Sequence, residues 1–135
     1  MTSKSGFFDL GDFEIAGAGT QTGTSTTGFT DTKSIAFDAR LEYGSSGTTI
    51  VAVIQTSLNQ GSTWIDIARF DFTTSGAEKV VTLTSISRTS PLSVAALGSE
   101  GANDGIFGDR YRAVITSTGT YTNSTVLAVR MDVKV

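Results

Sequence analysis

Residues 50–72, IVAVIQTSLNQGSTWIDIARFDF, decide the fold, because two apolar runs are joined there by a short polar segment. Asn59 and Gly61 stand where a tight reversal of the chain needs positive φ angles, and β-branched and aromatic residues flank them, so the stretch predicts a β-hairpin. In the second run the apolar positions change from odd to even numbers. This change predicts a β-bulge or a switch of sheet near residues 68–69.

Alternation of apolar and polar residues predicts further half-buried strands on both sides of this hairpin. In residues 35–43 every odd position is apolar and three of the four even positions are charged, and residues 127–135 alternate in the same way. Residues 48–58 are apolar at both parities, which predicts a central strand covered on both faces. Other strands are expected at 79–84, around 92–97 and at 110–117.

The composition favours an all-β domain. The chain is rich in Thr, Ser and Gly, contains a single proline and has little of the Ala, Leu, Glu and Lys patterning that builds helices. Glycine- and serine-rich stretches at 44–47 and 119–123 supply turns between short strands. We therefore predict an antiparallel β-sandwich, jelly-roll-like in arrangement, with an extended N-terminal arm and at most one helical turn, around residues 93–97.

Residue types that are missing exclude several kinds of chemistry. The 135-residue chain contains no Cys and no His, which excludes disulfides, thiolate or imidazole metal sites, cysteine nucleophiles and Ser-His-Asp triads. We therefore expect no enzyme activity and no cofactor. The formal charge is -3 and the basic residues are scattered, so nucleic acid is not an expected partner. Because no apolar run reaches the length of a signal peptide or a membrane span, we expect synthesis in the cytoplasm and no membrane partner.

Residues 1–33 differ from the rest of the chain and are predicted to form an N-terminal arm beside a sandwich of residues 34–135. Residues 16–28 are of low complexity, and such a segment forms either a surface loop or an extended arm that docks on a neighbouring subunit. The first fifteen residues are expected to pack against something, since a buried large apolar side chain contributes roughly 1.5–3 kcal/mol. The candidate partner contacts in this segment are Phe7, Phe8, Leu10 and Phe13.

Residues 98–109 form a second irregular stretch, in which three carboxylates lie among four glycines. The carboxylates could gather oxygen ligands for calcium, but their spacing matches no EF-hand loop or nonapeptide repeat. A solvated loop whose Asp side chains bond their own backbone is favoured, and no metal site is predicted. Glu100 and Asp104 complete the set of candidate partner contacts.

The hairpin carries a first resemblance. Ser57-x-Asn59-x-Gly61-x-Thr63-Trp64 resembles the Asp-box pattern, with Asn in place of the Asp. Asp-boxes are structural turns that recur in sialidase-like β-propellers and occur singly in other β-proteins. One copy in a chain of this length implies the turn geometry alone.

A second resemblance spans roughly residues 34–135. The order of motifs is similar to that in small head proteins of tailed bacteriophages, which resemble capsid decoration (cement) proteins. The motifs are Ala39-Arg40-Leu41-Glu42-Tyr43, Ser46-Gly47-Thr48-Thr49, Val53-Ile54-Gln55-Thr56-Ser57, Gly61-Ser62-Thr63-Trp64, Ile67-Ala68-Arg69-Phe70, Gly108-Asp109-Arg110-Tyr111-Arg112 and Ser117-Thr118-Gly119-Thr120. The resemblance implies a virion protein on the capsid surface that binds the major capsid protein, stabilises the head and forms a homo-oligomer, with a trimer expected.

Two other functions remain open for a β-domain of this kind. One is a head-fibre or host-surface carbohydrate-binding module that uses Trp64, Tyr121 or the loop at 98–109. The other is a tail or neck component. For Trp64 we favour a structural role, because a tryptophan just after a hairpin turn usually covers one end of a core.

Overall fold

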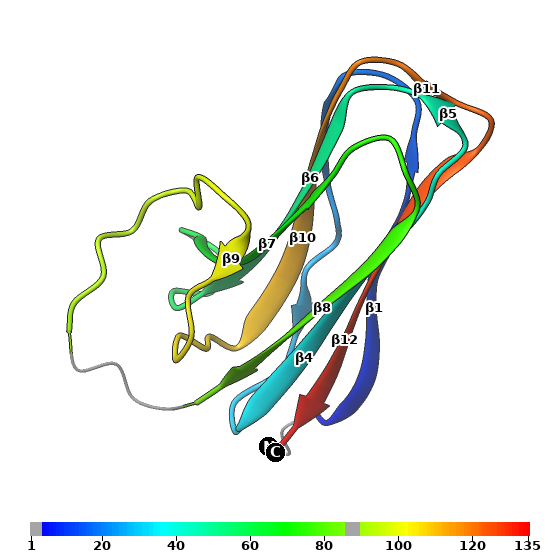
Figure 1. Cartoon of the computed structure of the whole chain (residues 1–135). Coiled ribbons are helices and arrows are strands. Elements are labelled where there is room, and N and C mark those ends of the chain that lie inside the picture. The colour runs from blue at the N-terminus through cyan, green and yellow to red at the C-terminus, as the bar shows by residue number, and fades with distance from the viewer. Residues whose placement is uncertain (1–3, 86–89) are drawn as a thin grey trace.

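The computed structural model of the protein describes residues 4–85 and 90–135. Two antiparallel sheets pack face to face over these residues, which contain no helix (Figure 1). Sheet A has the strand order β1 (Gly6–Ile15), β12 (Thr125–Lys134), β4 (Ser34–Glu42), β8 (Ala77–Thr84). Sheet B has the order β2 (Gly19–Thr22), β10 (Arg110–Thr118), β6 (Thr49–Ser57), β7 (Ile65–Phe72), β9 (Gly101–Ala102). The predicted antiparallel β-sandwich is confirmed.

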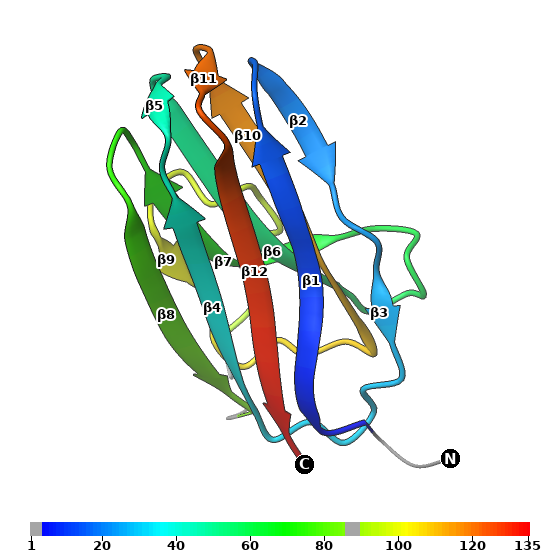
Figure 2. The same cartoon turned by 90° about the vertical axis from the view of Figure 1, so that its right-hand side faces the viewer.

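Three short strands lie beside the main sheets. β3 (Thr26–Thr27) pairs with β10 next to β2, so β2 and β3 together line one edge of sheet B (Figure 2). β5 (Ser45–Ser46) and β11 (Tyr121–Thr122) form a separate two-stranded ladder at one end of the sandwich. The two predicted turn regions therefore meet in space and pair with each other.

The core lies between the two sheets and follows from the period-2 pattern of the strands. Ile35, Phe37, Ala39 and Leu41 alternate along β4 and are all buried against sheet B. Tyr111 on β10 lies 6.2 Å from Phe37, ring centroid to ring centroid, and is fully buried. Burying each large side chain of this kind contributes roughly 1.5–3 kcal/mol, which is the main term that holds the sheets together.

The segment predicted as an N-terminal arm joins both sheets of its own chain. β1 pairs with β12 from Gly6↔Val133 to Ile15↔Thr125, and β2 pairs with β10. The physical reason is that apolar residues alternate on each side of the bulge between Asp9 and Gly11, and the bulge changes the parity so that both Leu10 and Phe13 lie in the core. The low-complexity stretch contains the edge strand β2, and all four residues of β2 are exposed. A segment with few apolar side chains can form this strand because it buries none of them.

β6 lies in the middle of sheet B, between β10 and β7, as the apolar run predicted. The prediction that it is covered on both faces is wrong. Val51 and Val53 on the outer face are half-buried, shielded by side chains of neighbouring strands and not by a further layer.

The predicted bulge is present, one residue before the expected position. Ile54 pairs with Ala68 and Gln55 pairs with Asp66, so Ile67 is the extra residue on β7. The strand predicted around residues 92–97 is absent, and those residues form neither a ladder nor a helical turn. They belong instead to the long connection between β8 and β9.

Residues 57–64 fold as an Asp-box-like turn held by side chains. Asn59 Oδ1 accepts hydrogen bonds from the Ser57 hydroxyl at 2.9 Å and from the Thr63 N–H at 2.8 Å. The Ser57 oxygen accepts the N–H of Gly61 at 2.8 Å. Positive φ angles occur at Gln60 and Gly61, so Asn59 acts through its side chain and not, as predicted, through its backbone.

Candidate interaction surfaces

The six predicted partner contacts do not form one surface. Phe7 points outward from β1 and is 68% exposed, whereas Phe8 packs against the core. Leu10 and Phe13 are core residues. Glu100 and Asp104 lie on the loop that carries β9, and both bond to the chain itself.

Glu100 caps the edge of sheet B. Its carboxylate accepts the N–H of Asp71 at 2.9 Å and pairs with Lys79 Nζ at 2.7 Å. Lys79 also donates to the carbonyl of Asp71 at 2.6 Å, so both backbone groups of this edge residue are satisfied. The hydrogen bond from Lys79, followed by that from the Asp71 N–H, lowers the pKa of Glu100.

Asp104 caps the edge of sheet A in a similar way. Its Oδ1 accepts the N–H of Thr84, the last residue of β8, at 2.7 Å. Unpaired strand edges are templates for association with another chain. The two carboxylates thus each bond one N–H at a strand edge within the molecule, a role that their spacing in the sequence does not reveal.

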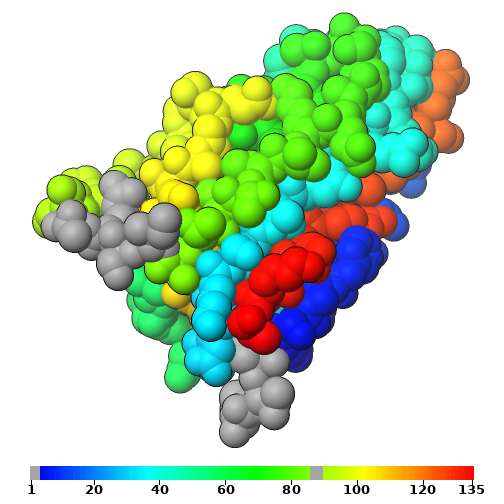
Figure 3. All heavy atoms as spheres, turned by 60° about the horizontal axis from the view of Figure 1, so that its bottom comes forward, coloured from blue at the N-terminus to red at the C-terminus, as the bar shows by residue number. Residues whose placement is uncertain are grey.

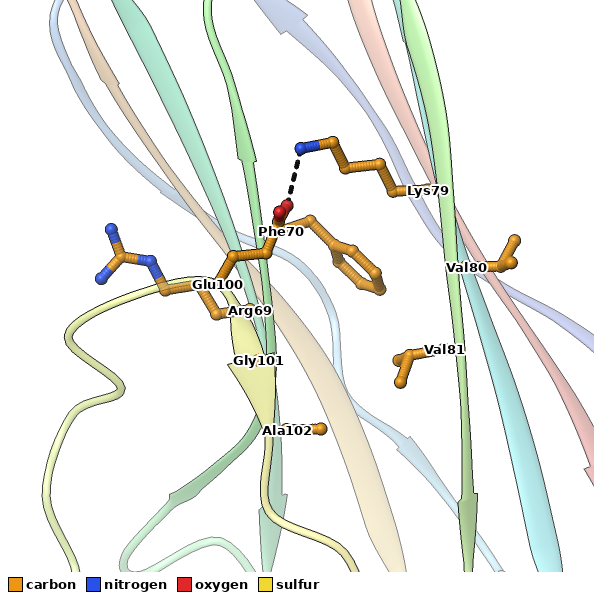
Figure 4. A pocket seen from close by; sticks show the side chains of 8 residues that line it. All are labelled: Arg69, Phe70, Lys79, Val80, Val81, Glu100, Gly101 and Ala102. Carbon is orange, nitrogen blue, oxygen red and sulfur yellow. Dashed lines mark hydrogen bonds and ion pairs between the residues drawn. The ribbon is translucent and has the colours of Figure 1, made fainter.

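A cleft of about 480 Å³ opens where β8 and the β7–β9 pair part. Figure 4 shows Phe70 between the two walls, with Val81 and Ala102 directed into the space and the Lys79–Glu100 ion pair across one end. Phe70 is almost fully buried, while Val81 is half-buried. The cleft therefore offers an apolar surface. The Lys79–Glu100 ion pair at its end is already formed within the molecule.

Trp64 is half-buried and its ring is covered by a cation. The guanidinium carbon of Arg112 lies 4.0 Å from the ring centroid. Arg112 also donates to Gln55 Oε1 at 2.8 Å, and Gln55 donates to Asp66 Oδ1 at 2.9 Å. Burial lowers the pKa of Arg112. The ring that could have stacked on a sugar is therefore part of an internal polar network on sheet B.

The outer face of sheet A is strongly acidic. Its four strands form adjoining bands on the surface in Figure 3, β1 in blue, β12 in red, β4 in cyan and β8 in green. Outward positions carry seven carboxylates and three cations, a formal charge of -4, against -3 for the whole chain. These residues are Asp9, Asp12, Glu14, Asp38, Glu42, Glu78 and Asp132 with Arg40, Arg130 and Lys134.

Arg130 is held on one side of this face by two ion pairs. Its guanidinium lies 2.8 Å from Asp9 and 2.7 Å from Asp12, both on β1. The bulge between Asp9 and Gly11 places both carboxylates on the outer side of the sheet. This cation is thereby paired with its neighbours on β1.

Asp38, the residue of β4 paired with Arg130, forms no ion pair of this kind within residues 4–85 and 90–135, and the side chain that adjoins it on β8 is the like-charged Glu78. Among the described residues its Oδ1 atom is buried and accepts no hydrogen bond. Burial raises the pKa of Asp38, and both the charge of Glu78 on β8 and a hydrogen bond between the two carboxyl groups raise it further, whereas Arg130 and Arg40 lower it. The face thus retains a carboxylate in unfavourable surroundings.

A hollow of about 200 Å³ lies next to Asp38, above the small side chain of Ala36. Phe7 and Val80 line it and are 68% and 70% exposed, among the largest exposures of apolar side chains in the described residues. A sequence signal for both exists: consecutive apolar residues on an alternating strand, Phe7-Phe8 and Val80-Val81, must place one member on each face. Sequence reasoning identified Phe7 and missed Val80 and Asp38.

No family model and no curated protein matches the chain. The described residues contain no cluster of three or more His, Cys, Asp or Glu side chains able to hold a metal ion.

A search for membrane spans finds no helix in residues 4–85 and 90–135 with the length and apolar character that crossing a bilayer demands.

Proposed function

We propose that the protein is a capsid decoration protein of a tailed bacteriophage, which binds the major capsid protein and stabilises the head. The observation that carries the proposal is the outer face of sheet A, where exposed Phe7 and Val80 flank a hollow in an acidic sheet surface. Exposed apolar side chains rimmed by charged ones are typical of protein-binding surfaces.

The order of the strands supports a jelly roll, a fold common among viral capsid proteins and also found in lectins. When the long strands are numbered in chain order, with β2 and β3 together as the second, sheet A has the order 1-8-3-6 and sheet B the order 2-7-4-5. Strands adjacent in the chain mostly alternate between sheets, as two Greek keys require. Since a fold alone does not determine function, this supports the proposal together with the resemblance over residues 34–135.

The capped strand edges also suit a protein that must stay dispersed before it meets a capsid. Glu100 and Asp104 each accept one N–H at a strand edge, that of Asp71 on β7 at 2.9 Å and that of Thr84 on β8 at 2.7 Å. Blocking edge-to-edge pairing leaves the sheet face as the surface for specific association. We propose a homotrimer as the bound form.

Cryo-electron microscopy of particles from the phage that encodes the chain tests the proposal. The expected result is additional density on the icosahedral lattice that fits the sandwich, in groups of three, and its loss when the gene is deleted. Heads without the protein should release DNA at a lower temperature than complete heads. Absence from purified particles, or density confined to the tail, neck or fibres, contradicts the proposal, and unchanged heads with lost host attachment favour the carbohydrate-binding alternative.

A further inference from the structure

We propose that the hollow above Ala36 receives an arginine side chain of the partner protein, whose aliphatic part lies between Phe7 and Val80 and whose guanidinium pairs with Asp38. The inference rests on the proposed function in taking the capsid protein as the source of this arginine. It adds the chemistry by which the surface recognises that protein.

Charge complementarity is the first argument. The outer face of sheet A has a formal charge of -4 and the whole chain -3, so all other charged residues together have a charge of +1. Complementary potentials across an interface set specificity and the association rate. The surface that covers this face is therefore expected to be basic.

A second copy of the chain is the less complementary occupant. The arginines on sheet B are already held by their own neighbours: Arg69 pairs with Asp71 at 2.8 Å and Arg110 with Asp109 at 3.1 Å. Arg112 lies over Trp64 and bonds to Gln55. Self-association through the two sheet faces would have to break these contacts.

The local chemistry of the hollow points to a cation with an apolar stem. Asp38 and Asp132 line it, and Asp38 Oδ1 lacks a hydrogen-bond donor among the described residues. Arg130 also lines it but is neutralised by Asp9 and Asp12. An unpaired buried acceptor is unfavourable, so a donor that the partner supplies to this carboxylate is favoured by the relief of that cost.

Arginine fits the walls of the hollow better than lysine does. Its planar guanidinium can bond a carboxylate through two N–H groups and can lie against an aromatic ring such as that of Phe7. Its methylene groups cover apolar surface while the head stays near charge, and Val80 offers such surface at 70% exposure.

The test is a titration of the ¹⁵N-labelled full chain, followed by amide chemical shifts, with two small probes. Nα-acetyl-arginine methylamide carries the proposed side chain, and Nα-acetyl-citrulline methylamide is its neutral isostere. We expect saturable shifts at Ala36, Asp38 and Val80 with the arginine probe. The citrulline probe lacks the positive charge and should therefore bind about tenfold more weakly, a difference of about 1.4 kcal/mol.

Variants separate a specific contact from a general acidic field. Asp38→Asn keeps the shape of the side chain and is expected to weaken arginine binding about tenfold, because it removes the charge of the acceptor and leaves a neutral hydrogen bond. Glu42→Gln removes the same charge from an exposed position at the end of the same strand and should change the affinity less than about twofold. Both variants should retain the amide spectrum of a folded chain.

Three results would overturn the inference: equal binding of the citrulline probe, equal losses in the Asp38 and Glu42 variants, or shifts that map outside the hollow. Shifts at the same amides that grow with protein concentration alone would show a second copy as the occupant and would also overturn it. Because no phage particle enters the titration, its failure is distinguishable from a failure to find the protein on the capsid.

Discussion

The outer faces of the two sheets are built from similar alternating strands, but they differ in how far their polar side chains are bonded to one another. On sheet B, Arg112, Trp64, Gln55 and Asp66 bond to or stack on one another, so the polar groups of the face are satisfied by their neighbours. On sheet A, Asp38 keeps an unbonded oxygen beside exposed apolar side chains. The difference indicates that sheet B contributes mainly to stability, whereas sheet A has surface left available for a partner.

Asp66→Ala is expected to have the largest effect on stability. Asp66 is 8% exposed and accepts hydrogen bonds from Gln55 at 2.9 Å and from the Leu97 N–H at 3.0 Å. Loss of two bonds to a charged acceptor should lower the free energy of unfolding by about 2–3 kcal/mol, measured by urea denaturation.

Asp132→Ala on sheet A is the matched control, because its ion pair with Lys134, at 3.2 Å, is exposed. A surface pair of this kind contributes about 0–1 kcal/mol. Similar losses in the two variants would contradict the contrast between the faces.

Asn59→Ala should have the next largest effect, because it removes the side chain that holds the turn at the end of β6. The turn loses the acceptor for Ser57 and for the Thr63 N–H, and a loss of about 1–2 kcal/mol is expected by analogy with a capping side chain. The same urea titration measures it.

Asn59→Asp is the control that keeps the acceptor oxygens. It should retain most of the stability, because the Thr63 hydroxyl, now 2.8 Å from Asn59 Nδ2 as acceptor, can rotate to donate. A loss in the Asp variant as large as in the Ala variant would show that the amide donor, and not the acceptor oxygen, maintains the turn.

Strands whose signal is local could be predicted from the sequence. β4 at Ser34–Glu42 and β12 at Thr125–Lys134 lie within two residues of their expected bounds, because alternation is a property of the strand itself. The Asp-box-like turn could be predicted for the same reason, because the hydrogen bonds that hold it lie within residues 57–63. The sandwich follows from several such strands together.

Features that depend on which strands become neighbours could not be predicted. Leu97 ends an apolar stretch, but its N–H is bonded by Asp66 and its carbonyl by Arg69, so no ladder forms. The surroundings of Asp38 arise only because β8 lies beside β4 and brings Glu78 close. Neither contact has a signature in the sequence near the residue.

Phe7→Ser should separate binding from stability on sheet A. The exposed ring contributes little to folding, so a change in unfolding free energy of less than about 0.5 kcal/mol is expected. Under the proposed function, re-binding to phage heads that lack the protein should weaken about tenfold, because exposed aromatic side chains are frequent anchors of interfaces.

Leu58→Ser is the matched control for Phe7→Ser, since Leu58 is a 64% exposed apolar residue in the turn after β6, away from the sheet A face. It should bind like the unaltered chain. Equal loss of binding in both variants would exclude a special role of the sheet A face.

The smallest expected effect is on the pH dependence of stability. The pKa of Asp38 is raised in the folded chain, mainly by burial and then by Glu78, so the folded state holds this proton more tightly than the unfolded state does. Its stabilising contribution is fully present below the pKa that the group has in the unfolded chain and is lost as the pH rises through the raised pKa of the folded chain. Asp38→Asn should therefore gain stability relative to the unaltered chain as the pH increases from strongly acidic to neutral.

Glu100→Gln should show the opposite trend, because the pKa of Glu100 is lowered and its contribution is lost as the pH falls through that pKa. Urea midpoints over a pH series measure both, and parallel curves for the two variants would show that the acidic face of sheet A carries no unrelieved carboxylate.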